Sequence, residues 1–169
     1  WGVQGSFPFV SAYPNCVQTA CLSVDLDEAF LIFDAGTGLM NLDQAFASIN
    51  KPIYFFMSHF HFDHIMGFPY FSQFLKENKD IYIVHPYPDK AKDVFSFLFQ
   101  ENLFPLSTSK LVSSPTFIPP SSLSFSSFSM DVISVNHPGE AFAYKLTHQN
   151  KSFVYCTDNE LVPEKARDL

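Results

Sequence analysis

Short apolar runs separated by turn-forming residues dominate the first half of the chain. Their lengths and their β-branched and aromatic content are typical of strands. The pattern predicts four strands, at residues 20–25, 29–34, 53–57 and 81–84. A tight polar turn at 25–28 joins the first two into a hairpin, and the glycine-rich segment 34–38 predicts a sharp turn after the second.

Apolar positions at helical spacing lie between these strands. They predict a short helix from Leu42 to Ile49, with Asn41 or Asp43 as its N-cap. Two further helices are predicted over 67–76, with a proline in the first turn, and over 88–99. We therefore expect strands and helices to alternate in this half.

The second half is richer in strands. Residues 107–129 are rich in serine, but regularly placed Leu and Phe predict short edge strands and turns there. Three strands follow, at 131–135, 141–147 and 152–156, and the last two form a hairpin around residues 148–151. This order predicts a layered α/β fold in a single domain over residues 1–169.

Size and charge narrow the classes of partner. A chain of 169 residues, 47% of them hydrophobic, can bury one sizeable core. No apolar run reaches the roughly 18 residues of a membrane span, so a membrane partner is not expected. A net charge of −7 argues against long nucleic acids. Bound cations would still let a small anionic substrate enter an active cleft.

The three cysteines do not form a recognisable framework. Cys16, Cys21 and Cys156 are too few and too scattered for a disulfide-stabilised scaffold, and none belongs to a Cys-x-x-Cys pair. Reduced cysteines indicate a cytoplasmic protein. Cys156 follows Val-Tyr in an apolar run, which predicts a buried strand residue.

Candidate chemistry concentrates in residues 58–64, Ser-His-Phe-His-Phe-Asp-His, directly after an apolar strand. Three imidazoles and a carboxylate suit Zn²⁺, with Mn²⁺ and Fe as competitors. In an extended segment His59, His61 and Asp63 project to one side. His64 joins them only if the chain turns, towards a second metal position. The alternative is a polar loop with chance histidines, which the density of ligands disfavours.

Two later motifs also follow predicted strands, where α/β proteins usually place ligand sites. His137-Pro-Gly-Glu140 ends one strand, and a histidine held in a Pro-Gly turn could complete a three-histidine site. Asp158 follows the last strand, and each of its two oxygens could bind one cation. The alternative for Asp158 is a turn residue that caps the next segment.

Together these motifs resemble the metallo-β-lactamase fold superfamily. The segments 34–38, 63–71, 137–139 and 154–158 are similar to the branch described as class II cyclic-nucleotide phosphodiesterase-like, near the ribonuclease Z-like hydrolases. The resemblance covers about residues 5–160. It implies a metallo-β-lactamase-type four-layer αβ/βα sandwich with a site for two Zn²⁺ ions at one edge.

The resemblance also implies a role for each ligand. The first metal would be held by His59, His61 and His137. The second metal would be held by Asp63 and His64, and Asp158 would bridge the two metals. Asp34 would lie beneath the site and orient a ligand histidine or a water. The equally open alternative is that Asp34 only shapes the turn after its strand.

One expected ligand is missing. The superfamily pattern has another histidine after the position of Asp158, whereas no histidine follows His148. His148 lies in a predicted turn, and His85 is expected to be structural or exposed. Either the second metal position is weakened, or the sequence is truncated at its C-terminus with an incomplete second half. We favour truncation, which would expose apolar sheet surface and promote association, such as a homodimer.

The ligand set predicts a metal-dependent hydrolase. Two ions that share a water would lower its pKa towards 7 and supply metal-bound hydroxide, with Asp63 or Asp158 as the catalytic proton acceptor. The expected substrate is a phosphodiester such as a small cyclic nucleotide. The alternatives are a lactone or thioester hydrolase, an RNA-processing enzyme, and a non-catalytic metal-binding or interaction domain.

Aromatic residues near the motif are candidates for the rim of the substrate pocket. Four of them lie within or just after it: Phe60, Phe62, Phe68 and Tyr70. Core packing is the expected role for at least half of them.

Overall fold

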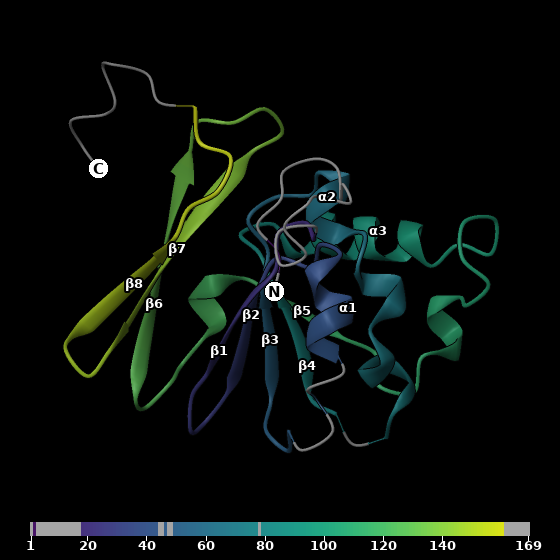
Figure 1. Ribbon diagram of the computed structural model, residues 1–169, viewed down its shortest axis with the longest axis horizontal. Helices are drawn as coiled ribbons and strands as arrows, with labels where there is room; N and C mark the ends of the chain where they lie inside the picture. Colours follow the sequence, from purple (N-terminus) through teal and green to yellow (C-terminus); the bar gives the residue numbers. More distant parts are fainter. Residues whose placement is uncertain (1, 3–17, 44–45, 47–48, 78, 161–169) are drawn as a thin grey trace, which may run out of the picture.

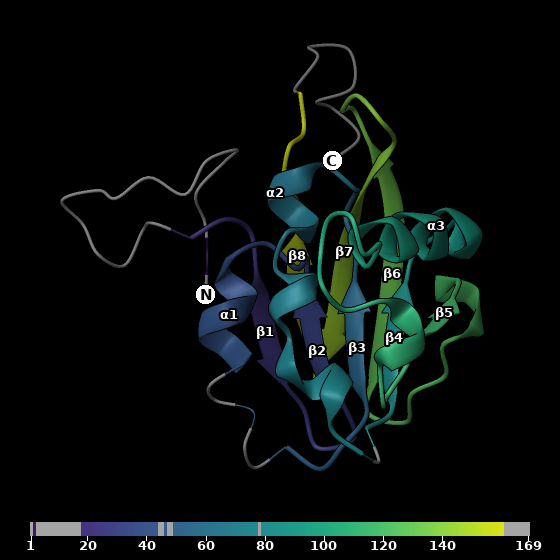
Figure 2. The same cartoon turned by 90° about the vertical axis from the view of Figure 1, so that its right-hand side faces the viewer.

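The structure is a computed structural model, and it describes residue 2 and residues 18–43, 46, 49–77 and 79–160. Two β-sheets lie face to face, and the helices cover the far side of the larger sheet (Figure 1). After a quarter turn the helical side faces the viewer, and the strands lie behind it (Figure 2). The predicted α/β class is therefore confirmed.

The larger sheet has five strands in the order β1-β2-β3-β4-β5. β1 is antiparallel to β2, and the other neighbours are parallel. The strands are β1 (Leu22–Asp25), β2 (Phe30–Phe33), β3 (Ile53–Phe56), β4 (Ile81–Val84) and β5 (Thr116–Ile118). The central strands are apolar at every position because both faces of a parallel sheet are covered.

The smaller sheet is antiparallel, in the order β6-β7-β8. Its strands are β6 (Phe128–Val135), β7 (Ala141–His148) and β8 (Lys151–Tyr155). One face packs on the larger sheet, and the buried Tyr144 hydroxyl donates a 2.9 Å hydrogen bond to the carbonyl of Met57. The other face exposes Ile133 and Val154. No α-helix of the described residues covers it, so three of the four expected layers are present (Figure 1).

The α-helices and all but the last of the 3₁₀ turns form the third layer, and that last turn lies against β6 of the smaller sheet (Figure 1). The α-helices are α1 (Gly38–Asp43), α2 (Phe62–Ile65) and α3 (Pro88–Leu98). The 3₁₀ turns are η3 (Phe68–Tyr70), η4 (Ser72–Leu75), η5 (Thr108–Lys110) and η6 (Pro120–Ser122). In the part of the chain that the structure describes, no helix has both the length and the apolar character needed to cross a membrane.

Two predicted helices differ from the observed ones. α1 begins at Gly38, before either proposed N-cap, and Asp43 near its end instead accepts a 3.1 Å hydrogen bond from the Ser72 amide. Residues 44–45 and 47–48 lie outside the described part. The segment 67–76 forms two 3₁₀ turns rather than one helix, because extended Phe71 interrupts it and inserts its ring into the core. Tertiary packing thus outweighs local periodicity there.

The strand predictions hold, with small shifts. β6 begins three residues earlier than expected, and the β7–β8 turn contains Gln149 and Asn150 with positive φ. Cys21 is buried, but the prediction of a buried Cys156 is wrong. β8 ends at Tyr155, so the next side chain leaves the sheet and is exposed. Cys16 lies outside the described residues.

Candidate metal centre

The central histidine motif lies where β3 ends. The three residues after β3 are also buried: Met57, Ser58 and His59. The chain then turns at His61, the N-cap of α2. The prediction that Asp63 projects to the same side as His59 and His61 from an extended segment is wrong, because Asp63 lies in the first turn of α2. The turn separates the motif into two ligand groups.

Two glycines let α2 approach the turn that follows β2. A Cβ atom on Gly36 would lie 2.4 Å from the carbonyl oxygen of Asp63, and one on Gly67 would lie 2.2 Å from the carbonyl oxygen of Gly36. The close approach allows the Ala35 amide to donate a 2.7 Å hydrogen bond to the carbonyl of His64. The glycine turn therefore holds α2 and its two ligands in place.

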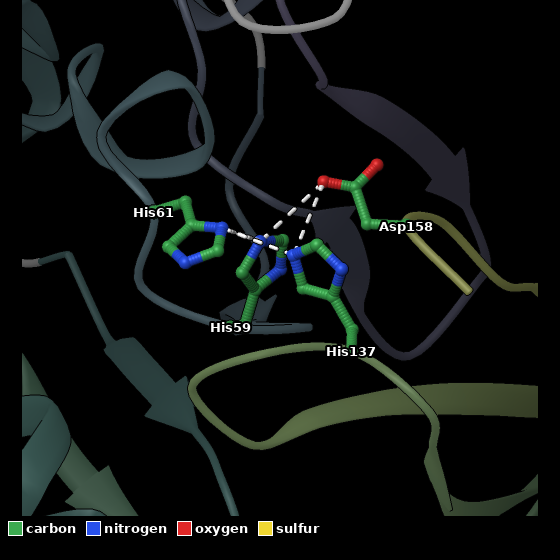
Figure 3. Close-up of side chains that lie close together, drawn as sticks. All are labelled: His59, His61, His137 and Asp158. Carbon is green, nitrogen blue, oxygen red and sulfur yellow. Dashed lines mark hydrogen bonds and ion pairs between the residues drawn. The ribbon is translucent and has the colours of Figure 1, made fainter. Parts of the chain in front are cut away.

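The first group contains three imidazoles and one carboxylate (Figure 3). The Nδ1 atom of His61 lies 3.0 Å from the Nε2 atoms of both His59 and His137. The Oδ2 atom of Asp158 lies 3.5 Å from Nε2 of His59 and 3.9 Å from Nε2 of His137. All four ligand atoms lie within 4.8 Å of one another.

The second group contains Asp63, His64 and the same Asp158. Nε2 of His64 lies 3.4 Å from Oδ2 of Asp63 and 3.2 Å from Oδ2 of Asp158. The six residues expected from the sequence are thus brought together as two groups that share one carboxylate.

The separations within both groups fit a divalent metal ion. With Zn–N and Zn–O bonds near 2.0–2.1 Å, two ligand atoms on a tetrahedral ion lie about 3.3 Å apart. The distances given above, 3.0 to 3.9 Å, bracket that value. Imidazole and carboxylate are also the donors that such ions prefer.

The smaller sheet supplies the candidate ligands that are distant in sequence from the central motif. His137 lies in the turn between β6 and β7, where Gly139 has a φ of 90° and a Cβ atom there would lie 3.5 Å from Nε2 of His61. Lys90 of α3 holds this turn by donating hydrogen bonds to the Gly139 carbonyl at 3.2 Å and the Glu140 carboxylate at 3.0 Å. Sequence reasoning missed Lys90, because nothing in the local pattern relates it to a turn 49 residues away.

The turn that carries Asp158 is held in a similar way. Its backbone has a φ of 46°, and the side chain of the next residue, Asn159, accepts a 3.1 Å hydrogen bond from the Asn136 amide. Glu160 in turn donates its amide to the carbonyl of Asn136 at 2.7 Å. The segments that bear His137 and Asp158 are therefore joined to each other.

Asp34 lies beneath the site and is fully buried. Its Oδ2 atom lies 2.7 Å from Nδ1 of His64 and accepts hydrogen bonds from the hydroxyls of Ser58 at 2.6 Å and Tyr155 at 2.9 Å. Its Oδ1 atom accepts the Ser58 amide at 2.7 Å. Its φ of 57° also forms the turn after β2. Both roles considered for Asp34 are therefore present.

The two buried histidines among the candidate ligands differ electrostatically. Burial, followed by the proximity of His64, lowers the pKa of His59 to about 4, so its imidazole is neutral near pH 7 and able to bind a metal. Burial also acts to lower the pKa of His64. The hydrogen bond to Asp34 and the neighbouring carboxylates outweigh that effect and raise the pKa above its ordinary value.

The remaining histidines lie apart from the ligands. His85 is fully buried, and its Nδ1 accepts the Tyr87 amide at 3.1 Å, in agreement with the predicted structural role. Its Nε2 atom has no hydrogen-bond partner among the described residues. Burial lowers its pKa to about 4. His148 ends β7 at the hairpin turn, as predicted.

The four aromatic candidates for the rim divide evenly. Phe68 is buried in the core and Phe60 packs against it. Phe62 and Tyr70 are 64% and 58% exposed, so they remain available to a substrate.

Solved structures share this fold. The short form of human tRNase Z (ELAC1) aligns with a TM-score of 0.64 and 14% identity, covering 97% of this chain and 70% of that one. The metallo-beta-lactamase fold protein YhfI from Bacillus subtilis has a TM-score of 0.60 at 18% identity, covering 91% and 59%. Unliganded yeast PDE1 has a TM-score of 0.59 at 13% identity, covering 94% and 64%. This chain thus spans 59–70% of the length of these proteins.

Sequence comparison gives the family directly. No curated protein sequence matches the chain. The family described as Beta-lactamase superfamily domain matches residues 30–169, which include every candidate ligand. The expected resemblance is confirmed, and tRNase Z and PDE1 stand among the structural neighbours as the expected branch requires. This chain belongs to the beta-lactamase superfamily domain family.

Proposed function

We propose that this protein is a metal-dependent hydrolase with a site for two metal ions, Zn²⁺ first among the candidates. The observation that carries the proposal is the sharing of Asp158 by two ligand groups, one of four residues and one of three. A carboxylate shared in this way would let the two groups hold two ions side by side, as dinuclear hydrolases do. The first group, with three imidazoles, would be the tighter position.

The protein's own residues would prepare the reaction in distinct ways. Bound divalent ions lower the pKa of a coordinated water and stabilise negative charge that develops on the substrate. His59, neutral near pH 7, offers a lone pair without first losing a proton. Asp158, whose side chain is 36% exposed, can accept a proton from the attacking water, and Asp63 is the second candidate.

A phosphodiester of a small nucleotide is the proposed substrate. A pair of metal positions can stabilise both the attacking and the leaving oxygen of an in-line displacement at phosphorus. A net charge of −7 favours a small anion over a long polyanion. The names of two structural neighbours, tRNase Z and PDE1, support the choice of phosphodiester chemistry.

The test combines metal content with turnover on the full chain. The protein, purified without chelators, is analysed for Zn, Mn and Fe, and then assayed with bis(p-nitrophenyl) phosphate, a cyclic nucleotide and p-nitrophenyl acetate. We expect close to two ions per chain and phosphodiester turnover that His59→Ala abolishes. His148→Ala is the matched control, because it removes an imidazole from the other end of β7.

Other results would redirect or overturn the proposal. Turnover of the acetate ester alone would move the function to acyl hydrolysis on the same site. Bound metal without turnover of any ester would favour a non-catalytic binding domain. A chain that binds no divalent ion would contradict the metal centre itself.

A further inference from the structure

Ser58 lies between β3 and the first ligand histidine and is fully buried. Its hydroxyl oxygen is surrounded by polar groups from three parts of the chain. It donates to Oδ2 of Asp34 at 2.6 Å and lies 3.0 Å from Nδ1 of His59. Thr157, next to the bridging Asp158, donates its hydroxyl to the same oxygen at 3.4 Å. Ser58 thus contacts His59 of the first ligand group and Thr157, the residue before the shared Asp158.

The number of available protons determines the direction of these hydrogen bonds. An ionised carboxylate only accepts, so the single hydroxyl proton of Ser58 is used towards Asp34. Towards His59 the Ser58 oxygen can then only accept, which places the proton of the neutral imidazole on Nδ1. The lone pair of Nε2 is left facing His61 and Asp158.

The Asp34 carboxylate also contacts a histidine of the second ligand group, and this contact is direct. Nδ1 of His64 lies 2.7 Å from Oδ2 of Asp34, compared with 3.5 Å from the Ser58 hydroxyl. Nδ1 of His64 therefore donates to Asp34, and its Nε2 faces Asp63 and Asp158. One buried carboxylate sets the tautomer of a histidine in each group, directly for His64 and through a hydroxyl for His59.

We propose that Ser58 is a positioning residue that links the two metal positions, because it carries the orienting effect of Asp34 to His59 while Asp34 orients His64 itself. The inference rests on the proposed function, in which these histidines hold metal ions. Loss of the hydroxyl would leave Nδ1–H of His59 without its acceptor and the ring free to turn. His64 would keep its carboxylate partner, so the two positions should respond unequally.

Zinc affinity measures this inequality. The full chain, stripped of metal, is titrated with Zn²⁺ against a competing chromogenic chelator, as the wild type and as Ser58→Ala. We expect one of the two dissociation constants to rise about tenfold, the usual scale for a group that orients a metal ligand, and the other to stay unchanged. Ser113→Ala is the matched control, because Ser113 is a buried serine that donates to the Lys76 carbonyl away from the ligands.

A second measurement needs no substitution. Nitrogen-15 NMR of the zinc-loaded wild type should show the proton of His59 on Nδ1, in slow exchange with water. Ser58→Ala should lose this slow exchange at His59 and keep it at His64. A purely structural role for Ser58 would lower stability without this selective change.

The results separate the failure of this inference from that of the proposed function. A wild type that binds no Zn²⁺ overturns both. Two bound ions with a His59 proton on Nε2 overturn the role of Ser58 alone, even if Ser58→Ala does not fold. The same conclusion follows if Ser58→Ala binds both ions as tightly as Ser113→Ala does.

Discussion

The five-stranded sheet is covered on both faces, whereas the described residues cover the three-stranded sheet on one face only. All four residues of β2 are buried, but β6 buries one of its eight. The site lies between these unequal partners. The larger sheet carries Asp34, Ser58 and the central motif at its strand ends, and the smaller sheet adds His137 and Asp158 from turns.

The difference teaches how the site divides its tasks. The groups that orient ligands, Asp34 and Ser58, are fully buried on the larger sheet, where dense packing keeps them in one arrangement. Asp158, which the two candidate ligand groups share, lies on the more exposed side, where its side chain is 36% exposed to solvent. The buried orienting groups therefore come from the larger sheet, whereas the smaller sheet adds an accessible carboxylate beside the exposed His61.

The largest expected effect is on the contact between the sheets. Phe33 is fully buried, and its ring packs on Phe56 and on Tyr155 of the smaller sheet, with centroids 5.4 and 5.2 Å away. Phe33→Ala should lower the free energy of unfolding by about 3–5 kcal/mol, measured by urea denaturation. Ile133 is 53% exposed on the uncovered face of the smaller sheet. Ile133→Ala should therefore lower the free energy of unfolding by about 0.5 kcal/mol or less. Equal losses would contradict the comparison.

A smaller effect on the free energy of unfolding is expected from His85, a polar residue that is buried directly after β4. The pKa of His85 is about 4 in the folded chain against an ordinary value of 6.5, so the unfolded chain binds more protons between these values. Stability from this group is lost as the pH falls from 6.5 to about 4. His85→Asn can still accept the Tyr87 amide but does not titrate in this range.

The measurement is urea denaturation of both proteins in chelator, at several values across that pH window. The variant should be less stable near pH 7, and the gap should narrow by about 1–3 kcal/mol on acidification. A gap that stays constant with pH would show that His85 does not contribute to acid sensitivity.

The smallest effect is expected at an exposed contact between the sheets. The Glu28 carboxylate in the β1–β2 turn accepts hydrogen bonds from Ser126 and Ser127 just before β6. The bonds from Ser127, above all, lower the pKa of Glu28 to about 2. The stabilisation is therefore present above the ordinary pKa of 4.5 and lost as the pH falls towards 2.

Glu28→Gln should lower Tm slightly near pH 7, because solvent screens an exposed contact. The difference from wild type should shrink below about pH 4.5 in thermal melts. Glu101→Gln removes an exposed carboxylate beyond α3 and serves as the control for net charge. A larger or pH-independent loss of Tm in Glu28→Gln would mean that this contact stabilises the fold through the backbone conformation rather than through the charge of Glu28.

Local pattern accounts for the elements that were predicted well. The apolar runs of β2, β3 and β4 and the periodicity of α3 depend on nearest neighbours and on burial, both of which composition reveals. The failures occur where distant packing decides. Phe71 breaks the predicted helix because its ring is needed in the core, and Asp63 leaves the side of His59 because α2 packs on the glycine turn.

The sequence by itself determined the family, the strand order along the chain and the set of candidate ligands, because these depend on which residues follow one another. Only the tertiary structure decided how the ligands divide around Asp158 and which groups orient them. That division depends on the packing of one sheet on the other, which brings residues nearly 100 positions apart within 3.5 Å. Sequence spacing carries no measure of such distances.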